Sequence, residues 1–159
     1  MVRNMVTLEL EVERQFAHAA DTVWELAGDF GGLQSWLPGV LSCRVEGAGA
    51  ADTGGNAVRV IAVVDGSVTR ERLESLDHAA RRYSYSIIEA LGLDADNHYL
   101  STFLVLPQAE GRCLVRWSAR FCLPLKMPAR KRKQLRDRIA GMYQYCLGSL
   151  ATTLRRDHS

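Results

Sequence analysis

The sequence lacks any apolar run of the roughly 20 residues that a membrane-spanning helix needs. Its first residues, 1–5, lead directly into a segment of alternating polar and apolar residues and not into the apolar core of a signal peptide. These absences argue against stable membrane insertion and against secretion. We therefore expect a cytoplasmic protein.

Cysteine is scarce and scattered, and no pair has the two-residue spacing that chelates zinc or forms a redox dithiol. None of the four histidines stands at metal-ligand spacing from a cysteine or a carboxylate. A phosphate-binding glycine motif and a nucleophile elbow are also missing. We expect no metal and no other cofactor, and we interpret the cysteines as small buried apolar side chains: Cys43, Cys113, Cys122 and Cys146.

Charge of one sign is not in excess, because 20 basic and 18 acidic residues leave a formal net charge of only +2. Nucleic-acid binding usually rests on a concentrated basic surface. One basic cluster does occur, from Arg130 to Arg138, where cations could meet phosphates or anionic lipid. A solvated helix face is the simpler interpretation, so we expect no nucleic-acid partner.

The composition that remains is that of a globular protein, with 47% hydrophobic and 24% charged residues among 159. No internal repeat, low-complexity stretch or linker divides the chain. A core of this size is sufficient for one domain, which we expect to span residues 1–159. The sequence leaves a monomer and a homodimer equally open.

Periodicity predicts a strand followed by helices at the start of the chain. Residues 6–13 alternate strictly between apolar and polar side chains, as in a half-buried strand. Apolar residues then recur at helical spacing over residues 21–30, and the helix is expected to end near Gly31. A second short helix is predicted over residues 33–37, ending at Pro38.

Six further segments rich in strand-forming residues follow, separated by turn residues such as Asp65-Gly66, Asp77-His78 and Glu110-Gly111. The remaining turns are predicted at residues 47–55 and 92–97. The segments are 40–46, 56–64, 67–76, 81–89, 98–107 and 113–123. The fold class is therefore α+β, with a meandering antiparallel sheet.

The C-terminal segment predicts one long amphipathic helix that begins after Pro128. Its apolar residues recur every three or four positions: Leu135, Ile139, Met142, Cys146, Leu150 and Leu154. Gly141 and Gly148 lie nearly on one face of this helix, and each costs about 1 kcal/mol relative to alanine. Two roles stay open for these glycines, close packing of the helix on the sheet and space for a ligand.

A set of short motifs accompanies this order of elements. They are Val23-Trp24, Asp29-Phe30-Gly31-Gly32-Leu33, Trp36 with Pro38, Glu71-Arg72-Leu73 with Asp77, Tyr83 with Tyr85, Tyr99 with Ser101, and Trp117 with Phe121. Together they resemble the START-like, birch-pollen-allergen-like superfamily and its bacterial polyketide cyclase/dehydrase-type (SRPBCC) members, over residues 6–154. One departure is Leu37, where relatives of this type often have histidine, so chemistry that depends on that histidine does not transfer.

The resemblance implies a helix-grip fold, in which a curved seven-stranded antiparallel sheet wraps around the long C-terminal helix and two short helices follow the first strand. It also implies an internal cavity for a hydrophobic ligand, although members of this fold serve as receptors, carriers and enzymes. The loops at residues 65–67 and 91–93 resemble those at the entrance of such a cavity, and exposed leucines would suit that place.

Glu71 is the principal candidate for chemistry in the cavity. Arg70 and Arg72 are easier to leave in water than to bury, so Glu71 is expected to point inward with Leu73. The resemblance implies the same, because the matching glutamate of the plant hormone receptors lines the pocket. A buried carboxylate needs a cation or several donors, and Arg59 is the candidate cation, with a surface position as the alternative.

Other inward-facing residues predict a wall of rings, hydroxyl groups and apolar side chains. Tyr99 and Ser101 could hold a carbonyl or hydroxyl group of a ligand, or could instead be hydrogen-bonded within the sheet. The predicted ligand-binding residues are Arg59, Ile61, Val63, Glu71, Tyr83, Tyr85, Tyr99, Ser101, Phe103, Trp117, Ile139, Met142 and Cys146.

Three functions are consistent with these residues. The first is binding of a small hydrophobic molecule that is polyketide-, aromatic- or lipid-like. The second is a cyclase or dehydratase, in which Glu71 moves a proton and Tyr99 stabilises an oxyanion. The third is contact with nucleic acid or a membrane through the basic start of the last helix.

Overall fold

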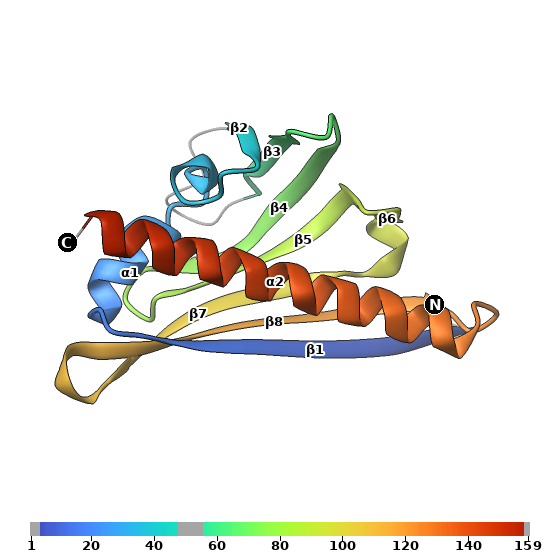
Figure 1. Cartoon of the computed structure of the whole chain (residues 1–159). Helices are drawn as coiled ribbons and strands as arrows, with labels where there is room; N and C mark the ends of the chain where they lie inside the picture. Colours follow the sequence, from blue (N-terminus) through green and yellow to red (C-terminus); the bar gives the residue numbers. More distant parts are fainter. Residues whose placement is uncertain (1–3, 48–55, 158–159) are drawn as a thin grey trace.

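The computed structural model describes residues 4–47 and 56–157, which form a curved antiparallel sheet with a long helix across its concave face (Figure 1). The strands are β1 (Met5–Phe16), β2 (Val40–Glu46), β3 (Val58–Val63), β4 (Val68–Asp77), β5 (Arg82–Ala90), β6 (Leu93–Asp94), β7 (Leu100–Gln108) and β8 (Arg112–Pro124). The helices are α1 (Ala20–Ala27) and α2 (Ala129–Asp157), with short 3-10 helices η1 (Leu33–Ser35), η3 (Ala95–Asn97) and η4 (Ala109–Gly111).

The sheet has the order β1-β8-β7-β5-β4-β3-β2, and the short β6 pairs with β5 outside this path. Its seven main strands confirm the predicted helix-grip fold and nearly match the predicted segments. The eighth strand, β6, lies in a stretch predicted only as a turn. Of the turn predicted at residues 47–55, all but Gly47 lies outside the described residues.

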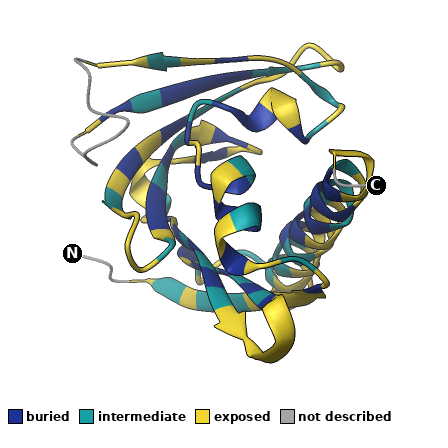
Figure 2. Ribbon diagram, turned by 90° about the vertical axis from the view of Figure 1, so that its left-hand side faces the viewer, coloured by how far each residue is buried: buried dark blue, intermediate teal, exposed yellow. Residues whose placement is uncertain are grey.

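The first strand forms its ladder with the last one, from Met5 opposite Pro124 to Phe16 opposite Cys113. As its alternating sequence predicts, the glutamates at 9, 11 and 13 of β1 are exposed and Val12 is buried. Figure 2 shows the sheet curving around α1 and α2, with buried residues on the strands and along one side of α2. The core therefore lies inside the curve of the sheet.

Helix α1 ends one turn earlier than predicted, at Ala27 and not near Gly31. Gly28 follows it, and a Cβ atom at Gly28 would lie 2.5 Å from the ring of Trp24. The buried indole of Trp24 therefore leaves room only for glycine at the end of this helix. The chain then turns into η1, which corresponds to the second predicted helix.

The buried stripe of α2 differs by about one position from the predicted one. It consists of Ile139, Tyr143, Leu147, Leu150, Ala151 and Leu154. Met142 is 40% exposed and Cys146 is half-buried, so both lie at the edge of the stripe. Positions three and four residues from Ile139 share nearly one face, and the apolar pattern alone does not choose between Met142 and Tyr143.

The two helix glycines have neither of the predicted roles. A Cβ atom at Gly141 or Gly148 would meet no other atom within 4 Å, which excludes close packing on the sheet. Neither glycine lines the cavity described below, so neither makes room for a ligand.

Within the described residues, no helix has the length and apolar character needed to cross a membrane.

Candidate functional site

A cavity of about 430 Å³ lies between the concave face of the sheet, η1 and α2. Most of the predicted ligand-binding residues line it: Arg59, Ile61, Val63, Glu71, Tyr85, Tyr99, Trp117, Ile139, Met142 and Cys146. Apolar residues that the prediction did not include complete its wall: Leu33, Leu37, Val40, Ile87 and Ala90. Leu37, at the position of the histidine of some relatives, thus adds an apolar surface to the cavity.

Tyr83, Ser101 and Phe103 were also predicted to line the cavity, and they do not. The rings of Tyr83 and Phe103 stack with centroids 5.5 Å apart, and Tyr83 also contacts Phe30 and Trp24. All three predicted residues face inward, as the alternation requires. Helix α1 and the segment after it cover Tyr83 and Phe103, which belong to the core. Ser101 instead lies beneath Trp117 and Tyr143, which both form hydrogen bonds with its Oγ atom.

Arg59 and Glu71 form a buried ion pair at directly opposite positions of β3 and β4. Arg59 Nε donates to Glu71 Oε1 at 2.7 Å, and the two side chains are only 2% and 11% exposed. Arg59 Nη1 donates to the carbonyl oxygen of Phe30 at 3.1 Å. The guanidinium also lies 4.3 Å from the ring centroid of Phe30 and 4.8 Å from that of Tyr85.

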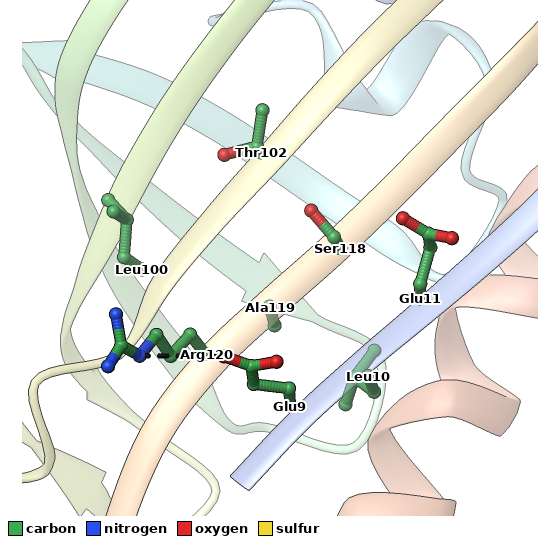
Figure 3. A pocket seen from close by; sticks show the side chains of 8 residues that line it. All are labelled: Glu9, Leu10, Glu11, Leu100, Thr102, Ser118, Ala119 and Arg120. Atoms are coloured by element: carbon green, nitrogen blue, oxygen red, sulfur yellow. Dashed lines mark ion pairs between the residues drawn. The ribbon is translucent and has the colours of Figure 1, made fainter. Parts of the chain in front are cut away.

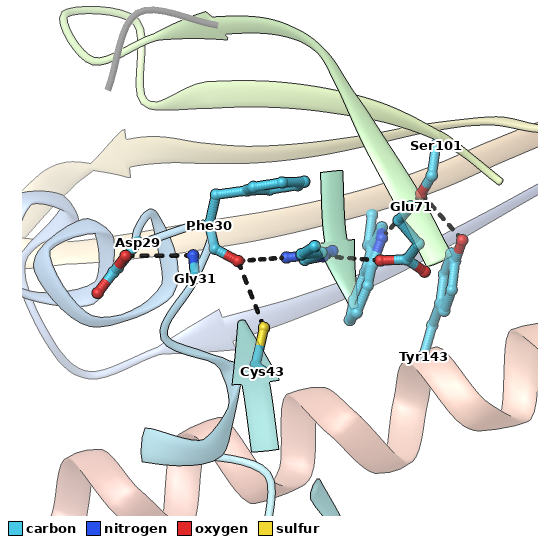
Figure 4. Close-up of polar contacts among 9 residues, drawn as sticks. Asp29, Phe30, Gly31, Cys43, Glu71, Ser101 and Tyr143 are labelled. Carbon is cyan, nitrogen blue, oxygen red and sulfur yellow. Dashed lines mark hydrogen bonds and ion pairs between the residues drawn. The ribbon is translucent and has the colours of Figure 1, made fainter. Parts of the chain in front are cut away.

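This pair provides Glu71 with the predicted cation, and the surface alternative for Arg59 is wrong. An arginine stays protonated in proteins, so its charge must be compensated where it is buried. The carboxylate of Glu71, the Phe30 carbonyl and two ring faces provide that compensation. Figure 4 shows Phe30 and Glu71 within this set of polar contacts. Glu71 is therefore held in place from the side of the sheet.

A second polar cluster joins β7 and β8 to α2. Trp117 Nε1 donates to Ser101 Oγ at 2.9 Å, and Ser101 Oγ donates to the carbonyl oxygen of Ser118 at 3.0 Å. The Tyr143 hydroxyl lies 2.9 Å from Ser101 Oγ and also forms a hydrogen bond with the Tyr99 hydroxyl. Ser101 and Tyr143 are drawn in Figure 4. The two tyrosines connect this buried cluster to the cavity, which both of them line.

Burial determines the protonation of the cavity hydroxyls and of the thiol beside them. It raises the pKa of Tyr143 well above its usual value. It also raises the pKa of Tyr99, although the hydrogen bond with Tyr143 acts in the opposite direction. Burial raises the pKa of Cys146 to about 12. At neutral pH these groups are therefore uncharged.

Tyr143 is a polar residue of the candidate site that the sequence analysis missed. It is buried, lines the cavity and forms hydrogen bonds with two predicted site residues. Its position midway between Ile139 and Leu147, at four-residue spacing, was the signal that could have identified it.

The entrance loops lie where the resemblance implied, because Asp65, Ser67 and Leu91 line the cavity. Leu91 is 43% exposed, as expected of an entrance residue. Leu93 is buried and belongs to the core, so the expectation of a second exposed leucine was wrong.

A hollow of about 490 Å³ on the outer face of β1, β7 and β8 differs in character (Figure 3). Glu9, Glu11, Thr102 and Arg120 are among its lining residues, and Arg120 pairs with Glu9 at 3.7 Å. Both side chains of that pair are about 70% exposed, at 69% and 72%. This polar, solvated hollow lacks the buried apolar wall of a small-molecule site.

The basic start of α2 is a solvated helix face. Lys133 pairs with Asp137 one turn later at 2.8 Å, and Arg136 pairs with Asp137 at 3.1 Å. Arg130 and Lys131 are exposed.

Among residues 4–47 and 56–157, no group of three or more histidine, cysteine or carboxylate side chains is arranged to hold a metal ion.

Solved structures of several other proteins are similar to this chain over nearly its whole length. An uncharacterized protein from Bacillus thuringiensis is 28% identical with a TM-score of 0.77, covering 92% of this chain and 98% of its own. XoxI from Bacillus cereus is also 28% identical with a TM-score of 0.77, covering 95% and 99%. Norcoclaurine synthase from Thalictrum flavum, solved with dopamine and hydroxybenzaldehyde, shares the fold at 20% identity, with a TM-score of 0.74 and coverage of 98% and 90%.

Comparison with curated proteins finds no match. The family model described as polyketide cyclase / dehydrase and lipid transport matches residues 7–155, which include every strand of the cavity wall and nearly all of α2. The chain therefore belongs to the polyketide cyclase / dehydrase and lipid transport family.

Proposed function

We propose that the protein binds a small, largely apolar molecule in the cavity between the sheet and α2. The observation that carries this proposal is an internal cavity of about 430 Å³ whose apolar wall is interrupted by a buried carboxylate, that of Glu71. Small-molecule sites have this character, a concave apolar surface with a few placed polar groups. Membership of a family that includes lipid transport supports the same function.

The test is binding of a neutral apolar fluorophore, N-phenylnaphthylamine, whose emission rises in an apolar environment. The variant Cys146→Phe places a ring in the cavity, since Cys146 lines it. Gln144→Phe adds the same ring to an exposed position of the same helix and is the matched control. We expect Cys146→Phe to weaken binding at least about 10-fold, which is about 1.4 kcal/mol. Equal affinity in both variants, with both folded, would place the binding outside this cavity.

Native mass spectrometry of the purified protein addresses the natural ligand. A molecule that stays bound in the gas phase and is absent from Cys146→Phe would identify the occupant by its mass. A lipid-like mass would favour a carrier.

A cyclase or dehydratase is the second candidate, and a specific contact favours it. Only Oε1 of Glu71 receives the hydrogen bond from Arg59, which leaves the second carboxylate oxygen on a residue that lines the cavity. Such a carboxylate can accept a proton from a bound substrate. With a polyketide mimic, Glu71→Gln should abolish turnover and largely retain affinity if the protein is an enzyme. A carrier would show no turnover in either form.

A further inference from the structure

We infer that the polar end of the cavity accepts hydrogen bonds through Tyr99 and Glu71, so that the ligand group placed there is an alcohol, a phenol or an amine and not a ketone. This inference rests on the proposed function and adds the class of ligand. It follows from counting the hydrogen atoms in the cluster of Ser101, Tyr143 and Tyr99. Each of these residues has one hydroxyl hydrogen to donate.

Ser101 determines which residue donates and which accepts in each hydrogen bond of the cluster. The carbonyl oxygen of Ser118 can only accept, so the single hydrogen of Ser101 Oγ is donated to it at 3.0 Å. The Trp117 indole N–H can only donate, and it fills one acceptor position of the same Oγ atom at 2.9 Å. Ser101 therefore has no hydrogen left for Tyr143, and Tyr143 must be the donor in their 2.9 Å contact.

The same count of hydroxyl hydrogens determines the donor between Tyr143 and Tyr99. Tyr143 has used its only hydrogen on Ser101, so in its contact with Tyr99 it accepts and Tyr99 donates. Tyr99 lines the cavity with an oxygen whose hydrogen points into the cluster and whose free lone pair can accept from a ligand. Because burial raises the pKa of Tyr99, this hydroxyl keeps its hydrogen at neutral pH.

Glu71 adds a second acceptor to this end of the cavity. A carboxylate has no hydrogen to donate, and its Oε1 already accepts from Arg59. Arg59 Nε donates to Glu71 and Arg59 Nη1 donates to Phe30, and the guanidinium is buried against the rings of Phe30 and Tyr85. The charge of Arg59 is therefore matched within the protein. The other cation of the cavity wall, Arg138, is an exposed residue of α2.

Tyr85 has the remaining hydroxyl group of this part of the wall. The charge of Glu71 acts on it, since burial and then the field of Glu71 raise the pKa of Tyr85 well above its usual value. A ligand O–H or N–H thus finds two acceptors here, Tyr99 and Glu71, whereas a ligand carbonyl finds no hydrogen on either of them.

The test is isothermal titration calorimetry with probes that share one naphthalene ring: naphthol, its methyl ether and the matching methyl ketone. We expect naphthol to bind at least about 10-fold more tightly than the ether or the ketone, because a hydrogen bond to a charged group contributes about 1.5–3 kcal/mol. A ketone or an ether that binds as tightly as naphthol would overturn the inference while the proposed function stands, and no binding by any probe would overturn both.

Tyr99→Phe assigns the preference to this cluster. It removes one of the two acceptors and should reduce the preference for naphthol over its ether by several-fold, since a hydrogen bond to a neutral group contributes about 0.5–1.5 kcal/mol. Tyr83→Phe is the matched control, since it removes a phenol hydroxyl from a buried residue that does not line the cavity. An unchanged preference in Tyr99→Phe, with circular dichroism showing an intact fold, would contradict the inference. Glu71→Gln is less suitable because it leaves Arg59 buried without a charged partner.

Discussion

Arg59 and Glu71 lie directly opposite each other on β3 and β4 and are joined by a hydrogen bond of 2.7 Å. Both residues also line the cavity. The pair therefore serves two purposes, since it compensates a buried cation and holds the carboxylate at the cavity wall. We therefore expect stability and ligand recognition to be coupled at these two positions.

Removing one member of this pair should strongly destabilise the protein. We expect Arg59→Met or Glu71→Leu to lower the free energy of unfolding by about 3–5 kcal/mol, because each leaves a buried charge uncompensated. The double variant should lose less than the sum of the two single variants, and urea unfolding measures all three. The control is Glu46→Gln, which breaks the exposed pair with Arg70 and should cost less than about 1 kcal/mol. Additive losses would show that the two charges do not stabilise each other.

Tyr143→Phe should reverse the hydrogen-bond polarity of the cavity. Without an acceptor on α2, the Tyr99 hydroxyl is free to turn its hydrogen toward a ligand. We expect the affinity for the naphthyl methyl ketone to rise several-fold relative to naphthol, as measured by calorimetry. If the ranking of the two probes stays the same, the direction assigned to the cluster is wrong.

Stability should fall in alkaline solution. Burial raises the pKa of Tyr83, Tyr85, Tyr99 and Tyr143. These phenols therefore stay protonated in the folded chain while they ionise above about pH 10 in the unfolded chain. Their contribution to stability is complete below that pH, and the unfolding free energy should decline as the pH rises above it.

Each such group should contribute a slope of about 1.4 kcal/mol per pH unit over this range. Urea unfolding at a series of alkaline pH values measures the slope. Tyr143→Phe removes one of the groups and should show a shallower decline than the unmodified protein. An equal slope in both would mean that Tyr143 ionises in the folded state.

Alanine should be tolerated at the two glycines of α2. Because a Cβ atom meets nothing within 4 Å at either position, Gly141→Ala and Gly148→Ala should each raise the free energy of unfolding by about 0.5–1 kcal/mol. Neither glycine lines the cavity, so ligand affinity should change less than about 2-fold. Thermal unfolding and calorimetry check the two parts. A loss of affinity would show that the bound state brings a ligand or another element against this face.

Ligand binding should depend little on salt. Apolar contacts are insensitive to ionic screening, whereas binding of phosphates through a basic surface weakens steeply as salt rises. We expect the Kd of naphthol to change less than about 2-fold between low and moderate salt. Arg130→Gln with Lys131→Gln, two exposed positions, should leave it unchanged. Salt-sensitive binding of DNA or anionic vesicles that this variant abolishes would instead support a role for the basic segment.

The alternation of residues determined most of the sheet. Residues 6–13 could be recognised as a strand because a period of two places alternate side chains on opposite faces, and β2 has the predicted bounds of 40–46. The inward direction of Glu71 also followed from the sequence, since two arginines flank it and cannot both be buried cheaply. The short strand β6 was not predictable, because two residues are too few to show a period.

Sequence alone established the family and an inward-facing carboxylate, because both depend on short motifs and local alternation. Only the tertiary structure decided which inward residues meet a cavity and which are covered by α1, as for Tyr83 and Phe103. The contact of Tyr99 with Tyr143 joins residues 44 positions apart and depends on how α2 is rotated about its axis. A rotation by one residue changes the apolar pattern little and changes the hydrogen-bond partners completely, which is why the sequence left that choice open.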